Sequence, residues 1–420
     1  MTTMDGWSRE RIQAFLAEEQ LGYQRIALPY GLATPGSDRT ATADEIFPAQ
    51  LDGRSVLDVG CSLGFFCHEA SRRRAGRVLG LDVDENRVRQ ARLIADCLQL
   101  PIEFQVHNIE RLAPVGVFDL VLCLNVLHKV RDPLAVLDVL IECTREKLIL
   151  ELPGPQDPRA RAGPDGVPAA HDADTCDATV LIGGGRLGRG DDLFFFTPGA
   201  VERLLLDHRR TIARVNFLSS PLDGRFLVVA WKRQIENLVI VAGLPGSGRS
   251  RLSKRLLRGT IPALHAVMGM EMTPSWVRSS PSWLLAQPEP LTPGMLFEYS
   301  LLRGSSLGAG SFEADPSLDV LACPSRTRVL MVWRDLPALL ARLEARRAAR
   351  APDTARERND EDELRDNPRI ACALFRKWFD FCRSRGLQVE YVDLTGEPEL
   401  IGAERFSAKL RSAGWEALST

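Results

Sequence analysis

The chain alternates between short apolar runs and stretches with helical spacing, and two of the apolar runs end in glycine-rich turns. Residues 55–66 read SVLDVGCSLGFF, and residues 237–250 read NLVIVAGLPGSGRS. In each, a β-branched apolar run is followed by a glycine turn and then by a helical pattern, which is how a parallel α/β sheet begins. Two such beginnings predict two separate sheets.

Four more apolar runs follow the first beginning and alternate with helical stretches. They end near Asp84, Ile109, Val126 and Pro153. Residues 153–192 are rich in Gly, Pro and Asp, which predicts a long loop that is either a functional lid or disordered. A helix with Thr197 as N-cap and Pro198 at its first position comes next. Strands at 211–217 and 225–233 are expected to complete the unit.

Length and composition bound the class of protein. A chain of 420 residues is longer than the chains that fold around one hydrophobic core. We therefore expect two α/β domains, residues 1–234 and residues 235–420. Apolar residues make up 45% of the chain and charged residues 26%, as in soluble globular proteins. The net charge is -2 and neither half is strongly basic, so there is no strong nucleic-acid signal.

The cysteines and the apolar runs indicate a cytoplasmic protein. The nine cysteines are scattered and odd in number, with no CxxC pair and no secretory signal. This pattern favours reduced thiols over a disulfide framework or a zinc site. No stretch reaches the roughly 18 apolar residues that span a bilayer. The sequence shows neither an acid cluster nor an HxxxH pair, so it does not predict a catalytic metal.

The first glycine turn predicts a site for a nucleoside-containing cofactor. In a parallel sheet covered by helices, ligands bind at the carboxyl ends of the strands. Gly60 and Gly64 allow a sharp turn and the close approach of a ligand to the backbone. Asp82 ends the next strand about 20 residues later, where a carboxylate can hold a ribose diol. Position 62 is Ser where a dinucleotide-binding loop has glycine, so NAD and S-adenosylmethionine must still be distinguished.

Five segments together resemble the successive motifs of class I S-adenosylmethionine-dependent methyltransferases. They are VLDVGCSLGFF, VLGLDVD, HNIERL, FDLVLCLNVLHKVRDPLAVL and KLILELP. The upstream LPYGLATPGSDRTATADEIFP resembles the lead-in of a subgroup that includes the carboxymethyl transferases of tRNA wobble uridine and methyltransferases of glycans and small molecules. The resemblance covers roughly residues 20–233, and it implies a Rossmann-like domain that binds S-adenosylmethionine.

The resemblance implies a set of cofactor-binding residues. They are Gly60, Cys61, Ser62, Gly64, Asp82, Asn108, Ile109 and Asn125. The turn would approach the methionine part, Asp82 would hold the ribose hydroxyls, and Asn125 would line the methyl-transfer site. Asn108 and Ile109 would flank the adenine. Asn108 stands where an aspartate is usual, but its carbonyl can still bond the adenine amino group.

His128 is the candidate catalytic residue. Methyl transfer requires alignment of the acceptor and, for a hydroxyl acceptor, removal of a proton. His128 follows the fourth strand, where the acceptor should lie, and an imidazole suits a general base near neutrality. The alternative is a histidine that caps the next helix or only touches the substrate. We expect Cys61, Cys67 and Cys123 to pack, and His68 to be structural.

The second glycine turn nearly matches the phosphate-binding loop GxxxxGK[ST]. In such a loop, backbone N–H groups cradle the phosphates and the helix N-terminus adds a favourable potential. The candidate nucleotide-binding residues are Gly243, Gly246, Ser247, Gly248, Arg249 and Ser250. Arg249 keeps the positive charge of the usual lysine, but its planar group is not equivalent, so binding is favoured over fast phosphoryl transfer. Ser250 is placed to bind Mg²⁺.

Other features leave the activity of this half open. Residues 261–283, where we would expect an acid, contain only Glu271, so there is no clear catalytic acid. Arg342, Arg346 and Arg350 share one helix face and indicate either a phosphate-clamping lid or a solvated surface. The layout of about residues 237–410 resembles P-loop kinases and sulfotransferases. That resemblance implies a P-loop NTPase-like α/β domain, with ATP and Mg²⁺ as candidate ligands.

We therefore expect a methyltransferase joined to a P-loop kinase-like domain. The expected acceptor is an oxygen of a glycan or of a small polar metabolite, and ATP would serve a second modification of that acceptor. One alternative is a tRNA wobble-uridine methyl or carboxymethyl transferase, which the lead-in favours and the charge disfavours. Another is a methyltransferase whose second domain is a non-catalytic interaction module. The oligomeric state stays open.

Overall fold

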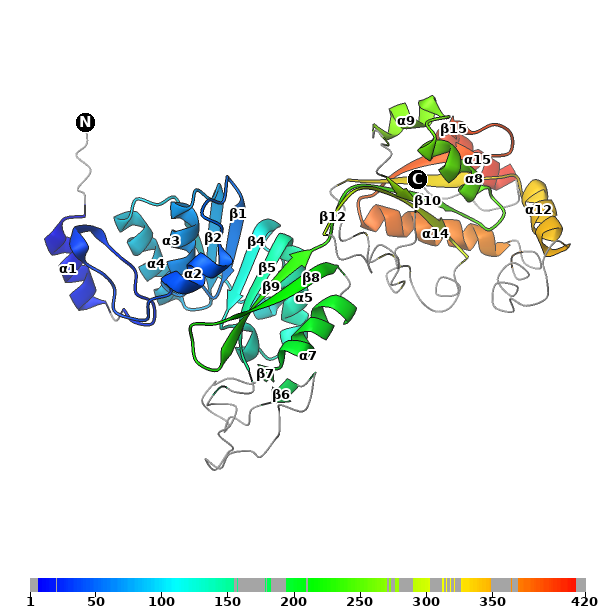
Figure 1. Cartoon of the computed structure of the whole chain (residues 1–420). Helices are drawn as coiled ribbons and strands as arrows, with labels where there is room; N and C mark the ends of the chain where they lie inside the picture. The colour runs from blue at the N-terminus through cyan, green and yellow to red at the C-terminus, as the bar shows by residue number, and fades with distance from the viewer. Residues whose placement is uncertain are drawn as a thin grey trace, which may run out of the picture. The chain divides into compact units, whose positions relative to one another are not determined.

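The chain forms two compact units, Met1–Lys232 and Arg233–Thr420 (Figure 1). The computed structural model describes residues 7–19, 21–154, 157, 178, 180–182, 194–208, 211–269, 272, 276–278, 290–302, 312, 315, 318, 321, 326–348, 364 and 369–412. Gln234, which we placed at the end of the first domain, is instead the first residue of a strand in the second unit.

The N-terminal unit contains a seven-stranded sheet in the order β3-β2-β1-β4-β5-β9-β8. Its strands are β1 (Ser55–Val59), β2 (Arg77–Asp82), β3 (Glu103–Val106), β4 (Phe118–Leu124), β5 (Thr144–Pro153), β8 (Ile212–Ser219) and β9 (Arg225–Lys232). Strands β1 to β5 are parallel, whereas β9 runs antiparallel to β5 and to β8. A separate antiparallel pair consists of β6 (Val180–Ile182) and β7 (Phe194–Phe196).

Helices cover both faces of this sheet. They are α1 (Arg9–Glu18), α2 (Thr40–Ile46), α3 (Phe65–Arg72), α4 (Glu85–Cys97), α5 (Pro133–Cys143) and α7 (Pro198–Arg203), with short helices η1 (Pro29–Gly31), η2 (Ile109–Arg111), η3 (Leu127–Lys129) and η5 (Leu204–His208). Successive strand residues point to opposite faces. On β1, Val56 belongs to the core cluster that includes residues of α1 to α4, whereas Leu57 belongs to the cluster that includes residues of α5 and α7.

The C-terminal unit contains a six-stranded sheet in the order β11-β12-β10-β13-β14-β15, in which β15 alone of the described strands is antiparallel. The strands are β10 (Gln234–Gly243), β11 (Val277–Arg278), β12 (Leu291–Ser300), β13 (Thr327–Trp333), β14 (Gln388–Asp393) and β15 (Glu399–Ile401). The helices are α8 (Arg249–Leu257), α9 (Pro262–Met268), α12 (Leu336–Ala348), α14 (Arg369–Ser384) and α15 (Ala403–Ser412). Val239 packs with α8 and α9, and Leu238 packs with α12, α14 and α15. The prediction of a second α/β sheet is thus confirmed.

Several predicted strands are shorter in the structure, for local reasons. They end at Asp82, Val106 and Leu124. Asn108 caps η2 by accepting the N–H of Glu110 at 2.9 Å, and Asn125 has a φ of +62°, which a strand does not accommodate. Thr197 caps α7 as predicted, accepting the N–H of Ala200 at 3.2 Å. Most of the predicted loop 153–192 lies outside the described residues.

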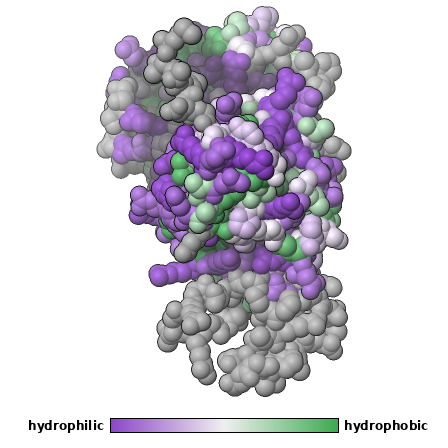
Figure 2. Space-filling view, turned by 90° about the vertical axis from the view of Figure 1, so that its left-hand side faces the viewer, coloured by the Kyte–Doolittle hydropathy of each residue, from purple (hydrophilic) through white to green (hydrophobic). Residues whose placement is uncertain are grey.

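The exposed large apolar side chains of the described residues come from several elements. The face shown in Figure 2 is mainly hydrophilic. The exposed apolar side chains include Tyr23, Tyr30, Val106, Val180 and Leu291. In the described part of the chain, no helix combines the length and apolar character that crossing a membrane requires.

The N-cap of α4 provides a test of the first sheet's helical layer. The Asp84 side chain accepts the N–H groups of Asn86 at 2.8 Å and Arg87 at 3.2 Å. Asp84→Ala removes both bonds, so we expect the opening free energy of α4 to fall by about 1 kcal/mol. Hydrogen exchange of the α4 amides measures this change. Asp84→Asn keeps a capping oxygen and is the control; equal losses in both variants would contradict the capping role.

Candidate active site

The first glycine turn lies where the order of the N-terminal sheet changes direction, because β1 pairs with β2 on one side and β4 on the other. Ligands of doubly wound sheets bind at such points. Gly60, Ser62 and Gly64 have φ values of +78°, +53° and +83°, in the left-handed region. A Cβ on Gly60 would lie 2.2 Å from Cγ2 of Val126, so the turn packs closely against the end of β4.

Phe104 of β3 fills the space beside two glycines. A Cβ on Gly64 would lie 2.7 Å from its ring, and a Cβ on Gly80 would lie 2.6 Å from it. Nε2 of the buried His68 donates to the carbonyl of Leu63 at 3.1 Å. Burial lowers the pKa of His68 to about 3, so the ring is neutral at physiological pH. His68 therefore supports the turn as a structural residue.

Asp82 ties the turn to the end of β2. Its Oδ2 accepts the N–H of Ser62 at 2.8 Å, and its Oδ1 accepts the N–H of Asp84 at 3.0 Å. The carboxylate is half-buried, and each oxygen retains a lone pair for a further donor. The geometry thus leaves Asp82 able to accept hydrogen bonds from a ligand.

Asp58 is a buried acid beneath this turn that the sequence did not single out. Burial raises its pKa to about 7, and the charge of Asp82 acts in the same direction. The Cys67 thiol donates to its Oδ2 at 3.6 Å. Burial also raises the pKa of Cys67, and it raises that of Cys123 to about 12. Both thiols are therefore protonated packing groups near neutral pH.

A buried carboxylate connects the ends of β4 and β5. The Glu151 side chain is 0% exposed, and its Oε2 accepts from the Arg39 guanidinium at 2.7 Å. The same oxygen accepts from Nδ2 of Asn125, and Oε1 accepts from the Ser220 hydroxyl at 2.6 Å. Sequence reasoning missed Glu151, Arg39 and Ser220. The one available signal was a glutamate inside the otherwise apolar run KLILELP.

The other predicted site residues lie on η2 and η3. His128 is fully buried in η3, so a role as base requires the acceptor to reach an enclosed ring. Ile109 is buried in the core beside α5. Oδ1 of Asn108 already accepts from Glu110, and its second lone pair remains for an adenine amino group. These assignments remain predictions.

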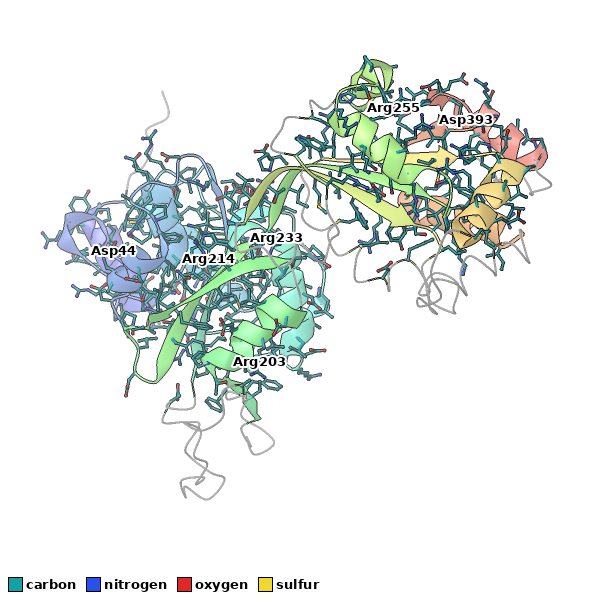
Figure 3. The ribbon with its side chains drawn as sticks, turned by 45° about the vertical axis from the view of Figure 1, so that its right-hand side comes forward. Asp44, Arg203, Arg214, Arg233, Arg255 and Asp393 are labelled. Carbon is teal, nitrogen blue, oxygen red and sulfur yellow. The ribbon has the colours of Figure 1, made fainter. Side chains whose placement is uncertain are left out.

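An apolar cavity lies on the α5 face of the sheet. It has a volume of about 850 Å³. Its described lining residues include Arg131, Pro133, Leu134, Val180, Phe194, Phe196, Arg203 and Leu204. Figure 3 shows Arg203 on α7. Because α5 follows η3 directly, the cavity lies a few residues along the chain from His128.

The second glycine turn joins β10 to α8, and β10 pairs with β12 on one side and β13 on the other. Gly246 and Gly248 have φ values of +78° and +104°. Two guanidinium groups converge on the turn: a Cβ on Gly248 would lie 3.5 Å from Arg334 and 4.0 Å from Arg342. Burial and then the charge of Arg342 lower the pKa of Arg334. Positive charge therefore gathers at the N-terminus of α8.

An acid that the sequence analysis did not consider contacts the first residues of α8, and whether this unit has a catalytic acid stays a prediction. Glu298 of β12 accepts from the Ser250 hydroxyl at 2.5 Å and from Nε of Arg278 at 2.7 Å. The sequence did not reveal Glu298, because its partners Ser250 and Arg278 are 48 and 20 residues away along the chain. Of the other residues considered there, Glu271 and Arg350 lie outside the described residues, and the side chain of Arg346 is not described. Figure 3 places Arg255 on α8 and Asp393 at the end of β14.

Comparisons with known proteins identify the N-terminal part. A family model described as a methyltransferase domain matches residues 50–153. Ubiquinone biosynthesis O-methyltransferases from Rhodopseudomonas palustris (strain HaA2) and Acinetobacter baylyi (strain ATCC 33305 / BD413 / ADP1) are 34% and 38% identical over 82 and 90 residues. These matches cover 20% and 21% of this chain, and 32% and 37% of those proteins. The chain thus spans about a third of the length of these curated relatives.

Two solved structures also match. The N-terminal domain of EvdMO1, solved in the presence of SAH and D-fucose, is 19% identical with a TM-score of 0.42, covering 54% of this chain and 98% of that one. The bifunctional kinase-methyltransferase WbdD is 19% identical with a TM-score of 0.36, covering 52% of this chain and 45% of that one.

The N-terminal part of the chain therefore contains a class I S-adenosylmethionine-dependent methyltransferase domain, as the sequence predicted. The seven-stranded sheet supplies its Rossmann-like fold.

The pKa of Asp58 predicts how the stability of the N-terminal unit depends on pH. Burial raises this pKa from its ordinary value of about 3.9 to about 7, so the folded unit holds a proton that the unfolded chain releases. The unfolding free energy should fall as pH rises from about 4 to about 7, by up to about 4 kcal/mol. Hydrogen exchange of the β1 and β4 amides, corrected for intrinsic rates, measures this change.

Asp58→Asn should flatten this pH dependence and make the unit more stable than the parent above pH 7. Asp52→Asn changes an exposed acid in the turn before β1 and should keep the parent's slope. Parallel slopes in the parent and Asp58→Asn would show that Asp58 is charged in the folded unit.

Proposed function

We propose that the N-terminal unit transfers a methyl group from S-adenosylmethionine to a hydroxyl oxygen of a small molecule or glycan. The observation that carries the proposal is the meeting of the Gly60 turn, Asp82 and Asn125 at the carboxyl edge of β1, β2 and β4. All three lie within the residues matched by the methyltransferase model. The named activity of the relatives, O-methylation, supports an oxygen acceptor.

The residues at this edge fit the cofactor chemically. S-adenosylmethionine carries donors, namely its ribose hydroxyls and its ammonium group, and its sulfonium supplies the methyl group. Asp82 offers carboxylate lone pairs, and Oδ1 of the buried Asn125 has no hydrogen-bond partner among the described residues. The close-packed Gly60 turn brings backbone groups to the same edge. Donors on the ligand would thus meet acceptors on the protein.

In the proposed reaction, His128 takes the proton of the acceptor hydroxyl as the oxygen attacks the methyl carbon of the sulfonium. The methyl–sulfur bond would break, and S-adenosylhomocysteine would leave. An imidazole base contributes typically 10²–10⁴-fold when it lies within hydrogen-bond reach of that proton. The full burial of His128 would exclude competing water from the ring. The apolar cavity beside α5 favours an acceptor that carries its hydroxyl on an apolar portion.

Two variants test the proposal on the full-length chain. His128→Ala should lower the methylation rate roughly 10²–10⁴-fold with unchanged cofactor affinity, because only the proton transfer is lost. Asp82→Ala should weaken S-adenosylmethionine binding by about 1.5–3 kcal/mol, the scale of a hydrogen bond to a charged group. Calorimetry measures the binding, and transfer of a labelled methyl group to a panel of hydroxyl compounds, glycans and tRNA measures the rate.

Glu85→Ala, an exposed acid three residues after Asp82, is the matched control and should bind like the parent. Unchanged affinity in Asp82→Ala would refute the ribose assignment. Methylation of tRNA alone would replace the small-molecule proposal with the wobble-uridine alternative.

We also propose that the C-terminal unit binds a phosphate-bearing nucleotide at the second glycine turn. The supporting observation is the convergence of Arg334 and Arg342 on Gly248, where the positive end of α8 adds to their charge. Ser250 and Glu298 would offer oxygen ligands to Mg²⁺ accompanying ATP. A kinase of the methyl acceptor and a non-catalytic interaction module are both compatible with this cradle.

Calorimetry with ATP and Mg²⁺ tests the cradle. Arg334→Ala should weaken binding about tenfold or more, since a charge-assisted contact to phosphate is lost. Arg258→Ala changes an exposed arginine at the other end of α8 and should leave binding unchanged. Arg249→Lys restores the common loop pattern; reduced phosphoryl transfer would indicate a kinase adapted to arginine. A parent chain that binds neither ATP nor GTP at millimolar concentration would leave the glycines as a turn only.

A further inference from the structure

The orientation of the Asn125 side-chain amide is fixed by its surroundings. A carboxylate only accepts hydrogen bonds, so the atom of Asn125 that faces Glu151 must be its NH₂ group, Nδ2. Rotating the amide by half a turn would press Oδ1 against the Glu151 carboxylate and leave Nδ2 without an acceptor. Oδ1 therefore faces away from Glu151, and the position of Glu151 decides where it points.

Glu151 is in turn held from three sides. Arg39, from the segment before the sheet, is 4% exposed and forms the ion pair at 2.7 Å. Its guanidinium also lies 5.3 Å from the ring of Phe66. Ser220, on the connection between β8 and β9, binds the second oxygen. The main-chain N–H of Asn125 donates to the Glu151 carbonyl at 3.0 Å. Parts of the chain far apart in sequence thus fix one carboxylate.

The side-chain oxygen of Asn125, Oδ1, is positioned to accept a hydrogen bond from a ligand. Oδ1 of Asn125 is buried, with a residue exposure of 3%, and has no hydrogen-bond partner among the described residues. Buried acceptors are nearly always paired, so one without a partner at a ligand-binding edge indicates a missing donor.

We propose that Glu151 is a positioning residue that fixes the Asn125 amide so that Oδ1 receives a hydrogen bond from a donor of the bound ligands. This inference rests on the proposed methyl transfer. Two donors share the required chemistry: a second hydroxyl of the methyl acceptor, beside the one whose proton His128 takes, and the ammonium group of the cofactor. Asn125 then contacts the reacting molecules, and Arg39, Glu151 and Ser220 act through it.

The test uses the full-length chain and two probes, S-adenosylhomocysteine and an analogue in which hydrogen replaces its amino group. Asn125→Gly removes the amide and tolerates the positive φ. If Oδ1 receives the ammonium, the parent should prefer S-adenosylhomocysteine at least tenfold over the analogue in calorimetry, and Asn125→Gly should lose that preference. If Oδ1 receives the second hydroxyl of the acceptor, both probes should bind the variant as they bind the parent, and kcat/KM for an acceptor from the panel should fall at least tenfold.

Glu151→Leu removes both acceptor oxygens, so it should reproduce the Asn125→Gly change on the same ligand, and the double variant should show no further loss. Glu146→Leu is the matched control, since Glu146 lies on the same strand and pairs with Arg54 at 3.0 Å outside the site. If Glu151→Leu fails to fold, a crystal structure of the parent with S-adenosylhomocysteine gives the amide orientation from the contacts of Oδ1 and Nδ2.

The outcomes separate the two proposals. A parent that does not bind S-adenosylhomocysteine overturns the proposed function together with this inference. A parent that binds it, with an Asn125→Gly variant unchanged within twofold in both assays, overturns this inference alone. A crystal structure in which Oδ1 of Asn125 faces Glu151 also overturns this inference alone.

Discussion

A carboxylate without access to water must have its charge and its lone pairs satisfied inside the protein, and the N-terminal unit meets this requirement at Glu151. An unpaired buried charge is strongly destabilising, so Glu151 depends most on its charged partner. Arg39 supplies the opposite charge, and Asn125 and Ser220 supply further donors. The lead-in segment, the ends of β4 and β5, and the β8–β9 connection are thereby held together.

The two sheets share one arrangement at their glycine turns. Each has a central strand, β1 or β10, that pairs on both sides and then turns through glycines into a helix. The surroundings differ in charge. The Asp82 carboxylate lies at the first turn, whereas Arg334 and Arg342 surround the second. The first turn suits a ligand with hydrogen-bond donors and a positive group, and the second turn suits an anion.

The sequence was sufficient to predict the parallel strands of the first sheet and both glycine turns, because these depend on local patterns, whereas β12 of the second sheet was not predicted. Apolar runs and left-handed glycines are determined within a few residues, and so is the acid at the end of β2. The Glu151 cluster could not be predicted in this way, since Arg39 and Glu151 are 112 residues apart and meet only after the sheet has formed. Glu298 escaped notice for the same reason. Its partners Ser250 and Arg278 come from different elements.

The ring of Phe104 limits which substitutions this domain can accept at two glycine positions. It occupies the volume that side chains at positions 64 and 80 would need, so the three positions share one space. Neither glycine can gain a side chain unless residue 104 becomes smaller, whereas a smaller residue 104 would open a void beside the cofactor turn. Positions 64, 80 and 104 are therefore expected to change together among homologues, as one evolutionary unit drawn from three separate elements.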